Sequence, residues 1–362
     1  MSHIVSVSLP SLAVDAGYFA KLPETNITKP AISLLAYHND FRAVLGCNAT
    51  ARKVWDLPWA AFHEGGLYNK KDNSLYITSN YESLTDNINV TVVSLDSDSY
   101  PLRSTQFPLL AMANGGTNYY PPGADRRQMR PLQVYCDQGD MSSRSQLLAV
   151  DANRNTSTPL LTNFLGRNFS SLNDVRQHPV TGDLWFTDTD YGHVQKFRPK
   201  PVLPKQVYRF EPATGVIQVV ADGFVEPNGI EFSPDLKTVY ISDTGSQQAE
   251  FDPRGPSTIY AFDVVDGKRL ANRRTFAWAD IGLPDGMHCD TNGNLWVSCG
   301  DGVHVWNPQG ILLGKIFVGE TSNNLAFAPG KIFVFSNKRM WVVENVAAQG
   351  REVCQDFGVG CH

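Results

Sequence analysis

Short apolar runs recur along this chain at nearly regular intervals. Each run is rich in β-branched and aromatic residues and ends in a small or acidic residue, which is typical of a buried β-strand. The six clearest runs lie at residues 75–78, 147–151, 184–188, 239–243, 295–298 and 332–336. Turn residues such as Gly, Asn and Asp precede most of these runs, and no long segment has a 3.6-residue apolar period. The pattern therefore predicts many strands and few helices.

The spacing of the runs favours one architecture. Successive runs are roughly 50 residues apart, which is the length of a propeller blade rather than of a solenoid repeat. We therefore predict an all-β, six-bladed β-propeller that forms a single domain over residues 1–362. We expect residues 1–40 to be a lead-in that contains a strand of the last blade and helps close the ring. Residues 350–362 read as a C-terminal tail.

Two Pro-rich segments interrupt the pattern, at residues 119–132 and 190–206. Long connections of this kind either cover a binding site or run over the surface as simple excursions. Both alternatives stay open for each segment, and the first of them places one loop over a mouth of the ring.

Four residues with oxygen-bearing side chains precede four of the runs in almost the same phase. Glu64, Asn173 and Asn228 each lie 11 residues before a run, and Asp285 lies 10 residues before one. If each run belongs to one repeat of a closed ring, these four residues occupy equivalent places and converge on one axis. Two carboxylates and two amide oxygens form a hard site of formal charge −2. Such a site suits Ca²⁺, with another divalent metal as the alternative.

Composition and charge narrow the kinds of partner. Charged residues make up 19% of the chain and hydrophobic ones 42%, which is typical of a globular protein. The net charge is −5 and there is no long basic run, which argues against nucleic acid or an anionic membrane as a partner. No apolar stretch approaches the roughly 18 residues that a membrane-spanning helix needs. A small-molecule partner is therefore expected.

The cysteines and glycosylation motifs leave the cellular compartment open. None of the six cysteines forms a CxxC pair, which excludes zinc-ribbon and thioredoxin-type sites. Cys289 and Cys299 flank one predicted hairpin and Cys354 and Cys361 lie in the Gly-rich tail, so a disulfide clip and buried thiols are both possible there. Five Asn-x-Ser/Thr motifs fit a secreted protein, at Asn26, Asn48, Asn89, Asn155 and Asn168. The first residues lack a basic segment followed by an apolar one, so the protein is either cytoplasmic or secreted with its leader removed.

Four short strings resemble a known family. They are HEGG at residues 63–66, LNDV at 172–175, EPNGIEFSPD at 226–235 and LPDGM at 283–287. In this order, between about residues 62 and 328, they are similar to the senescence marker protein/gluconolactonase family, which includes regucalcin and the fungal and bacterial lactonases. The resemblance implies a six-bladed propeller and lactone hydrolysis.

The same resemblance implies roles for the four residues of the predicted axis. It puts Glu64, Asn228 and Asp285 in the metal-ligand places of the family, and Asn173 where relatives bind either the metal or the substrate. Bound Ca²⁺ lowers the pKa of water far less than zinc does, so a protein base should help to activate the water. The resemblance gives that role to Asp285. Direct attack by the Asp285 carboxylate is the alternative in related enzymes.

Further residues are candidates for binding the substrate. Asn114 and Asn118 precede a long loop and would supply amide contacts, unless they form only a polar turn. His288 follows Asp285 by three residues, and His193 lies on the second long loop. His63 should face away from the axis, because neighbouring residues of a strand point to opposite sides. Two asparagines in the phase of the ligands, Asn323 and Asn324, are expected to support the site.

One position departs from the family pattern. Regucalcin-type relatives carry an Arg two residues before the Asn of the Asn-Asp motif, and this chain has Ser171 there. A basic contact to the substrate is then either missing or supplied from elsewhere, for example by Arg126, Arg127 or Arg130. Its loss predicts hydrolysis of several five- or six-membered lactones without a strict preference for gluconolactone.

The favoured function is therefore a Ca²⁺-dependent hydrolase of small sugar-acid or aliphatic lactones. A phosphotriester hydrolase is an alternative, since the same metal would polarise a phosphoryl oxygen. A non-catalytic propeller that binds calcium or a protein is another alternative, because propellers host many functions. The two carboxylates expected at the axis, Glu64 and Asp285, favour an enzyme.

Overall fold

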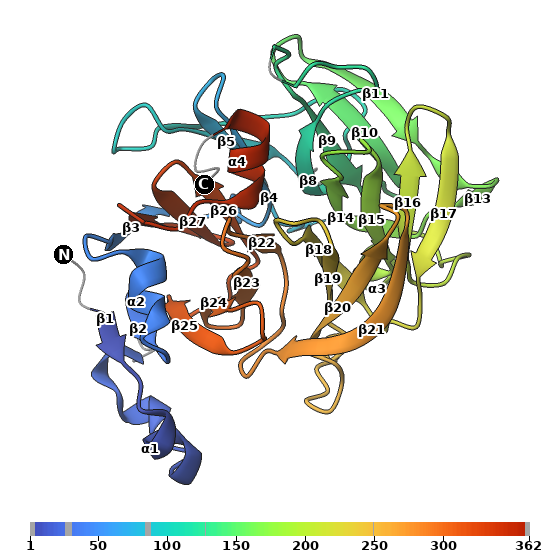
Figure 1. The fold of residues 1–362 in the computed structure, drawn as a ribbon. Coiled ribbons are helices and arrows are strands. Elements are labelled where there is room, and N and C mark those ends of the chain that lie inside the picture. The colour runs from blue at the N-terminus through green and yellow to red at the C-terminus, as the bar shows by residue number, and fades with distance from the viewer. Residues whose placement is uncertain (1–3, 26–30, 84–87, 127, 249, 359–362) are drawn as a thin grey trace.

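The protein is a ring of six β-sheets around a central axis, as a computed structural model shows (Figure 1). The structure describes residues 4–25, 31–83, 88–126, 128–248 and 250–358. The first strand of each blade lies next to the axis, where it contacts the first strands of the neighbouring blades. The predicted all-β, six-bladed propeller is confirmed.

The first three blades are antiparallel four-stranded sheets that follow the order of the chain. The first consists of β4 (Glu64–Asn69), β5 (Ser74–Thr78), β6 (Val90–Ser94) and β7 (Leu102–Thr105). The second consists of β8 (Ala113–Tyr119), β9 (Leu132–Asp137), β10 (Gln146–Asp151) and β11 (Thr156–Leu161). The third consists of β14 (Ser171–Gln177), β15 (Leu184–Thr189), β16 (Gln206–Glu211) and β17 (Val216–Ala221), and it follows a small hairpin of β12 (Asn163–Phe164) and β13 (Arg167–Asn168).

The fourth and fifth blades continue the same order, and the sixth joins the two ends of the chain. The fourth consists of β18 (Pro227–Phe232), β19 (Thr238–Asp243), β20 (Thr258–Val265) and β21 (Arg269–Trp278). The fifth consists of β22 (Met287–Cys289), β23 (Leu295–Cys299), β24 (Gly302–Trp306) and β25 (Leu312–Phe317). The sixth consists of β26 (Asn324–Ala328), β27 (Lys331–Ser336), β28 (Arg339–Glu344) and the N-terminal strand β3 (Thr50–Asp56).

The strand that closes the ring lies after residues 1–40, so that expectation is wrong. The closing strand is β3, which pairs antiparallel with β28 along its length. Residues 4–40 supply β1 (Ile4–Ser6) and β2 (Ser33–Ala36), which extend the outer edge of the fifth blade next to β25. The lead-in also contains α1 (Leu9–Val14), η1 (Phe19–Lys21) and η2 (Pro23–Thr25), and α2 (Asp40–Leu45) follows it.

One of the six runs used to predict the repeat is not equivalent to the others. Five of them are the second strand of a blade, whereas residues 147–151 lie in β10, the third strand of the second blade. The second strand there is β9, which the long segment at residues 119–132 separates from β8. Because of this offset, the spacing of the runs did not reveal the residue of the second blade that is equivalent to Asn173 and Asn228, which is Asn114.

Large aromatic side chains pack the blades against one another. Trp185 of the third blade meets Phe232 of the fourth edge to face, with ring centroids 5.6 Å apart. Trp296 of the fifth blade meets Phe327 of the sixth in the same way at 5.5 Å. Both tryptophans are fully buried. In both contacts the second strand of one blade packs against the first strand of the next.

Residues 350–362 are more than a tail. They begin with α4 (Arg351–Phe357), which lies over one end of the ring (Figure 1). Cys354 on this helix is disulfide-bonded, and Cys361, like the motif at Asn26, lies outside the described residues. Among the described cysteines, Cys47, Cys136, Cys289 and Cys299 are free thiols. The predicted hairpin therefore carries no clip.

Candidate metal centre

β-Bulges direct two of the four predicted ligands toward the axis. The pairing register shifts in the first strand of four blades: in β14 between Leu172 and Val175, in β18 between Pro227 and Ile230, and correspondingly in β4 and β8. Asn173 and Asn228 lie within two of these bulges. A bulge bends its strand and re-aims a side chain that regular pairing would send elsewhere. Glu64 precedes the shift in β4 and Asp285 precedes β22, whose pairing has no shift, so a bulge accounts for the phase of the two asparagines only.

The four predicted ligands line one cavity of about 160 Å³ at one mouth of the ring. Most of its wall is polar and uncharged. It is lined by His63, Glu64, Asn80, Tyr81, Ile88, Asn114, Gln138, Asn173, Tyr191, Gln195, Asn228, Thr244, Gln247, Leu283 and Asp285. The structure therefore brings together the residues that the repeat pattern placed on one axis.

Three of the four residues turn an unpaired oxygen into this cavity. Asn173 Oδ1, Asn228 Oδ1 and Asp285 Oδ1 are buried, and none of them accepts a hydrogen bond from the described residues. Buried polar atoms are nearly always paired, so three orphan acceptors in one cavity call for a shared donor or a cation. An oxygen-only donor set fits a hard divalent cation.

The charges of the site point the same way. Burial raises the pKa of Asp285 to about 7. Burial and the neighbouring carboxylate of Asp285 also raise the pKa of Glu64 well above its usual range. Two buried carboxyl groups so close together need a proton or a cation between them, because their like charges are costly in a poorly solvated site.

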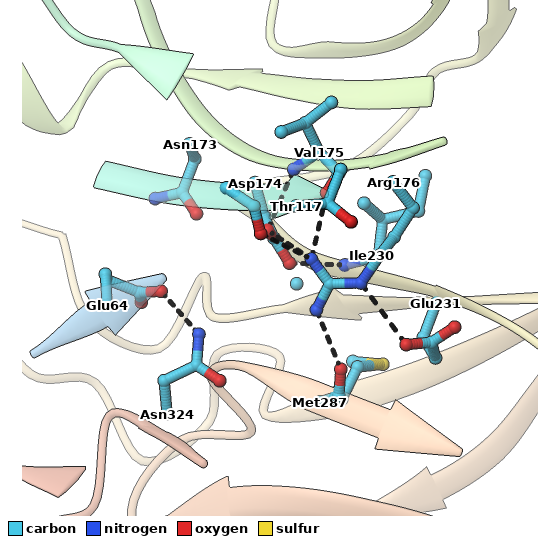
Figure 2. A network of polar contacts seen from close by, with 12 residues as sticks. Glu64, Thr117, Asn173, Asp174, Val175, Arg176, Ile230, Glu231, Met287 and Asn324 are labelled. Carbon is cyan, nitrogen blue, oxygen red and sulfur yellow. Dashed lines mark hydrogen bonds and ion pairs between the residues drawn. The ribbon is translucent and has the colours of Figure 1, made fainter. Parts of the chain in front are cut away.

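Two asparagines of the sixth blade hold these carboxylates in place, as the sequence predicted. Asn324 Nδ2 donates to Glu64 Oε2 at 2.7 Å (Figure 2), and Asn323 Nδ2 donates to Asp285 Oδ2 at 3.3 Å. Each carboxylate thus has one oxygen fixed by an amide. The remaining oxygen of Asp285 faces the cavity without a partner.

The predicted substrate-binding residues divide between the two ends of the ring. Asn114 lines the cavity and donates from Nδ2 to the backbone oxygen of Asn173 at 3.0 Å. Asn118 and His288 do not lie there: they line a different pocket beneath α4, so their assignment to the same site is wrong. Asn118 lies four residues further along β8 than Asn114, and the rise of about 3.3 Å per residue carries it toward the other end of the ring. His193 is exposed on α3 (Tyr191–Val194) and is not part of the cavity wall.

Several lining residues escaped the sequence reasoning. Gln138 follows the second strand of a blade, and Tyr191 and Gln195 come from the loop of α3, where no repeated motif marks them. His63 also lines the cavity, contrary to expectation, and its Nδ1 lies 2.9 Å from Asn337 Oδ1. Because of burial, the pKa of His63 falls to about 4, so the imidazole is neutral at pH 7. The signal that was available is the length of the 190–206 segment, which joins the second and third strands of the third blade.

Charged residues of opposite sign fill the channel between this cavity and α4. Arg176 donates to Asp174 Oδ1 at 2.9 Å, to Glu231 Oε2 at 3.2 Å and to the backbone oxygen of Met287 at 3.1 Å (Figure 2). Arg351 of α4 bonds the other oxygen of Glu231. All of these side chains are buried.

A second group of potential ligands lies in this network. One atom from each of Glu231, His288 and Glu352 lies within 4.8 Å of the others. Guanidinium groups already face both carboxylates, since Arg176 Nε is 3.3 Å from Glu352 Oε1 and Arg351 bonds Glu231. Each carboxylate here already faces a guanidinium, so this group does not resemble the unpaired oxygens of the cavity.

With this geometry established, the chain can be compared with known proteins. Residues 50–334 match the model of the SMP-30/Gluconolactonase/LRE-like region. The chain belongs to this family. The resemblance inferred from the four strings is therefore confirmed. No helix in the described part of the chain is long and apolar enough to cross a membrane.

Individual relatives are similar over part of the chain. The lactonohydrolase oryL of Aspergillus oryzae is 36% identical over 200 residues, which cover 51% of this chain and 46% of that protein. A gluconolactonase of Zymomonas mobilis is 28% identical over 48% of this chain and 49% of its own length. The matched segments thus span about half of these relatives. A solved gluconolactonase structure from Xanthomonas campestris has a TM-score of 0.69 at 27% identity and covers 87% of this chain and 96% of that one.

Proposed function

We propose that this protein is a calcium-dependent hydrolase of small lactones. The observation that carries the proposal is the set of unpaired, buried oxygens of Asn173, Asn228 and Asp285 in one cavity with Glu64. These four residues would hold the cation. When bound, Ca²⁺ supplies Lewis-acid polarisation of the lactone carbonyl. The names of the matched relatives, which are lactonohydrolases and gluconolactonases, support the same class of reaction.

Asp285 is the residue we assign to the proton transfer. Its Oδ2 is held by Asn323, which keeps the orientation of the carboxylate. Its Oδ1 has two lone pairs, so one would contact the cation while the other takes the proton of a water molecule. The water oxygen bonds to the carbonyl carbon and the ring C–O bond breaks. The proton then passes to the leaving ring oxygen, which gives the hydroxy acid. Neutral amides on the cavity wall, including Asn114, orient the lactone.

Metal analysis combined with assays before and after chelation tests the proposal. Purified protein should hold about one tightly bound Ca²⁺, and its lactonase activity should disappear on chelation and return when calcium is restored. A phosphotriester should be assayed in parallel, because its faster hydrolysis would favour the alternative reaction. Full lactonase activity in metal-free protein would contradict the calcium mechanism.

A further inference from the structure

The position where regucalcin-type relatives carry an Arg has a defined task in this structure. Ser171 is 1% exposed, and its Oγ donates to Gln138 Oε1 at 3.0 Å. The same Oγ accepts the backbone N–H of Gly192 in α3 at 3.2 Å. Since the serine hydroxyl has one hydrogen and already accepts from Gly192, that hydrogen goes to the Gln138 oxygen. Ser171 thus fixes the carboxamide of Gln138 and ties it to the helix that carries Tyr191.

This orientation gives Gln138 a free donor at the cavity. Its oxygen is occupied by Ser171, so its NH₂ group, with two hydrogens, is the end that remains for a ligand. Gln138 lines the cavity and is 6% exposed. A neutral amide therefore lies beside the position where regucalcin-type relatives carry an Arg.

No lysine or arginine compensates for the missing charge among the described residues of the cavity wall. Arg126 lies by α4, where it faces Asp356 at 3.4 Å. Arg130 forms an ion pair with Asp72. Arg127 lies outside the described residues. The long loop that carries these arginines therefore does not supply the basic contact from either described position.

Amides and hydroxyls dominate the wall instead. Seven carboxamides line it, and they belong to Asn80, Asn114, Gln138, Asn173, Gln195, Asn228 and Gln247. A carboxamide both donates and accepts, so it pairs with a substrate hydroxyl in either direction. An anionic group placed against the same wall would lose its hydration without meeting a basic side chain among the described residues, which is costly.

We propose that Gln138, oriented by Ser171, contacts the substrate and makes this site selective for uncharged hydroxylated lactones over lactones that carry a phosphate, sulfonate or carboxylate. The inference rests on the proposed lactonase function and concerns the substrate class of the same cavity. We still expect the site to accept several uncharged lactones, as the absence of the Arg predicts. Discrimination is expected by charge rather than by the pattern of hydroxyl groups.

Steady-state kinetics on a matched pair of lactones test this selectivity. Glucono-1,5-lactone and its 6-phosphate share the ring and differ by one anionic group. We expect kcat/KM to be at least about tenfold higher for the uncharged lactone, mainly through a lower KM, because uniform binding is lost without a change in the chemical step. Equal values would overturn the inference alone, whereas hydrolysis of neither lactone would overturn the proposed function with it.

Variants of Gln138 and Ser171 assign the effect to these residues. Gln138→Lys should narrow or reverse the preference by raising kcat/KM for the phosphorylated lactone, and Gln138→Glu should widen it. Ser171→Ala, a smaller change, should raise KM for the uncharged lactone several-fold with kcat nearly unchanged. Gln309→Lys, on an exposed turn, is the control for added charge and should leave the ratio unaltered. An unchanged ratio in folded Gln138→Lys and Gln138→Glu proteins would show that Gln138 does not contact the substrate.

Discussion

The two ends of the central channel contain similar acidic side chains, but their charges are balanced in different ways. At the open mouth, Glu64 and Asp285 are supported only by neutral asparagines, and three oxygens of the site lack a partner. Beneath α4, Glu231 meets two arginines, and every carboxylate of the group faces a guanidinium. Unpaired acids in a cavity indicate a binding site for a cation, whereas paired acids under a helix indicate a structural role.

The pKa values reflect this difference. At the mouth, burial raises the pKa of Asp285 to about 7, and no basic side chain opposes it. At the other end burial also acts to raise the pKa of Glu352, but Arg176, His288 and Arg351 hold it well below its usual range. A raised pKa thus favours uptake of a proton or a metal by Asp285 at the mouth, whereas a lowered pKa keeps Glu352 ionised at the other end.

Removing the charge of Asp285 should have the largest effect. Asp285→Asn keeps the size and one oxygen but removes the base and a ligand charge, so kcat should fall about 10³-fold or more, with the fold intact. Glu64→Gln should weaken calcium binding first and activity as a consequence. Kinetics with calcium titration measure both effects. Glu352→Gln at the other end is the control and should leave kcat within about twofold; equal, mild losses in all three proteins would abolish the proposed contrast.

Breaking the paired network should affect stability rather than chemistry. Arg351→Met leaves Glu231 with one arginine fewer in a buried place, which should lower the free energy of unfolding by about 3–5 kcal/mol. Arg274→Met removes an exposed ion pair with Asp263 and should cost less than about 1 kcal/mol. Urea denaturation of the two variants measures the difference. Similar stability losses would mean that the network under α4 contributes no more than a surface ion pair.

Calcium should stabilise the protein in a pH-dependent way. At a free concentration 100 times its dissociation constant, it should add about 2.7 kcal/mol to the free energy of unfolding. The folded, metal-free pKa of Asp285 is raised to about 7, so that carboxyl favours the metal-free fold below its unfolded pKa of about 4, and this contribution is lost as the pH rises toward 7. The calcium-induced rise in Tm should therefore grow between pH 5 and pH 8. A rise that is constant over this range would argue against Asp285 as a ligand.

The smallest expected effects distinguish two asparagines of one strand. Asn114→Ala removes an amide of the cavity wall and its bond to the backbone of Asn173, so kcat/KM should fall about tenfold. Asn118→Ala removes a bond to the backbone oxygen of Tyr68 at the other end and should cost about 1 kcal/mol of stability with kcat/KM unchanged. Kinetics and thermal unfolding of both proteins test this division. A lower kcat/KM in Asn118→Ala would indicate that Asn118 takes part in substrate binding after all.

Much of the site followed from residues that repeat in phase with the blades. Glu64, Asn173, Asn228 and Asp285 were found because each blade presents its first strand in the same way, and the cavity contains all four. Asn323 and Asn324 belong to the same phase and contact the carboxylates as expected. The second blade does not show the same spacing between ligand position and run, because its long 119–132 segment separates β8 from β9. Its residue Asn114 was therefore predicted only as a substrate-binding residue and not from the repeat.

Residues outside the repeat could not be placed in the same way. Three predicted residues are close in sequence to residues of the cavity but lie elsewhere: Asn118, His193 and His288. The rise along β8 moves Asn118 to the other end, His193 is on the exposed side of α3, and His288 lies within β22. Gln138 was missed because its place depends on Ser171 and Gly192, which come from the next blade and its loop. Neighbours along the chain share a site only when the strand between them has the right length and pleat.

The sequence by itself determined the fold class, the number of blades and the phase of the four residues that line the cavity as predicted ligands. Alternating apolar runs and turn residues are local properties, and a repeated local property remains visible in one dimension. The tertiary structure alone decided which strand closes the ring, where α4 packs and which carboxylates are neutralised. Arg351 reaches Glu231 across 120 residues of chain and Glu64 meets Asn324 across 260. Such pairings depend on the closure of the ring, which brings distant segments together. The local sequence pattern of either segment does not indicate its partner.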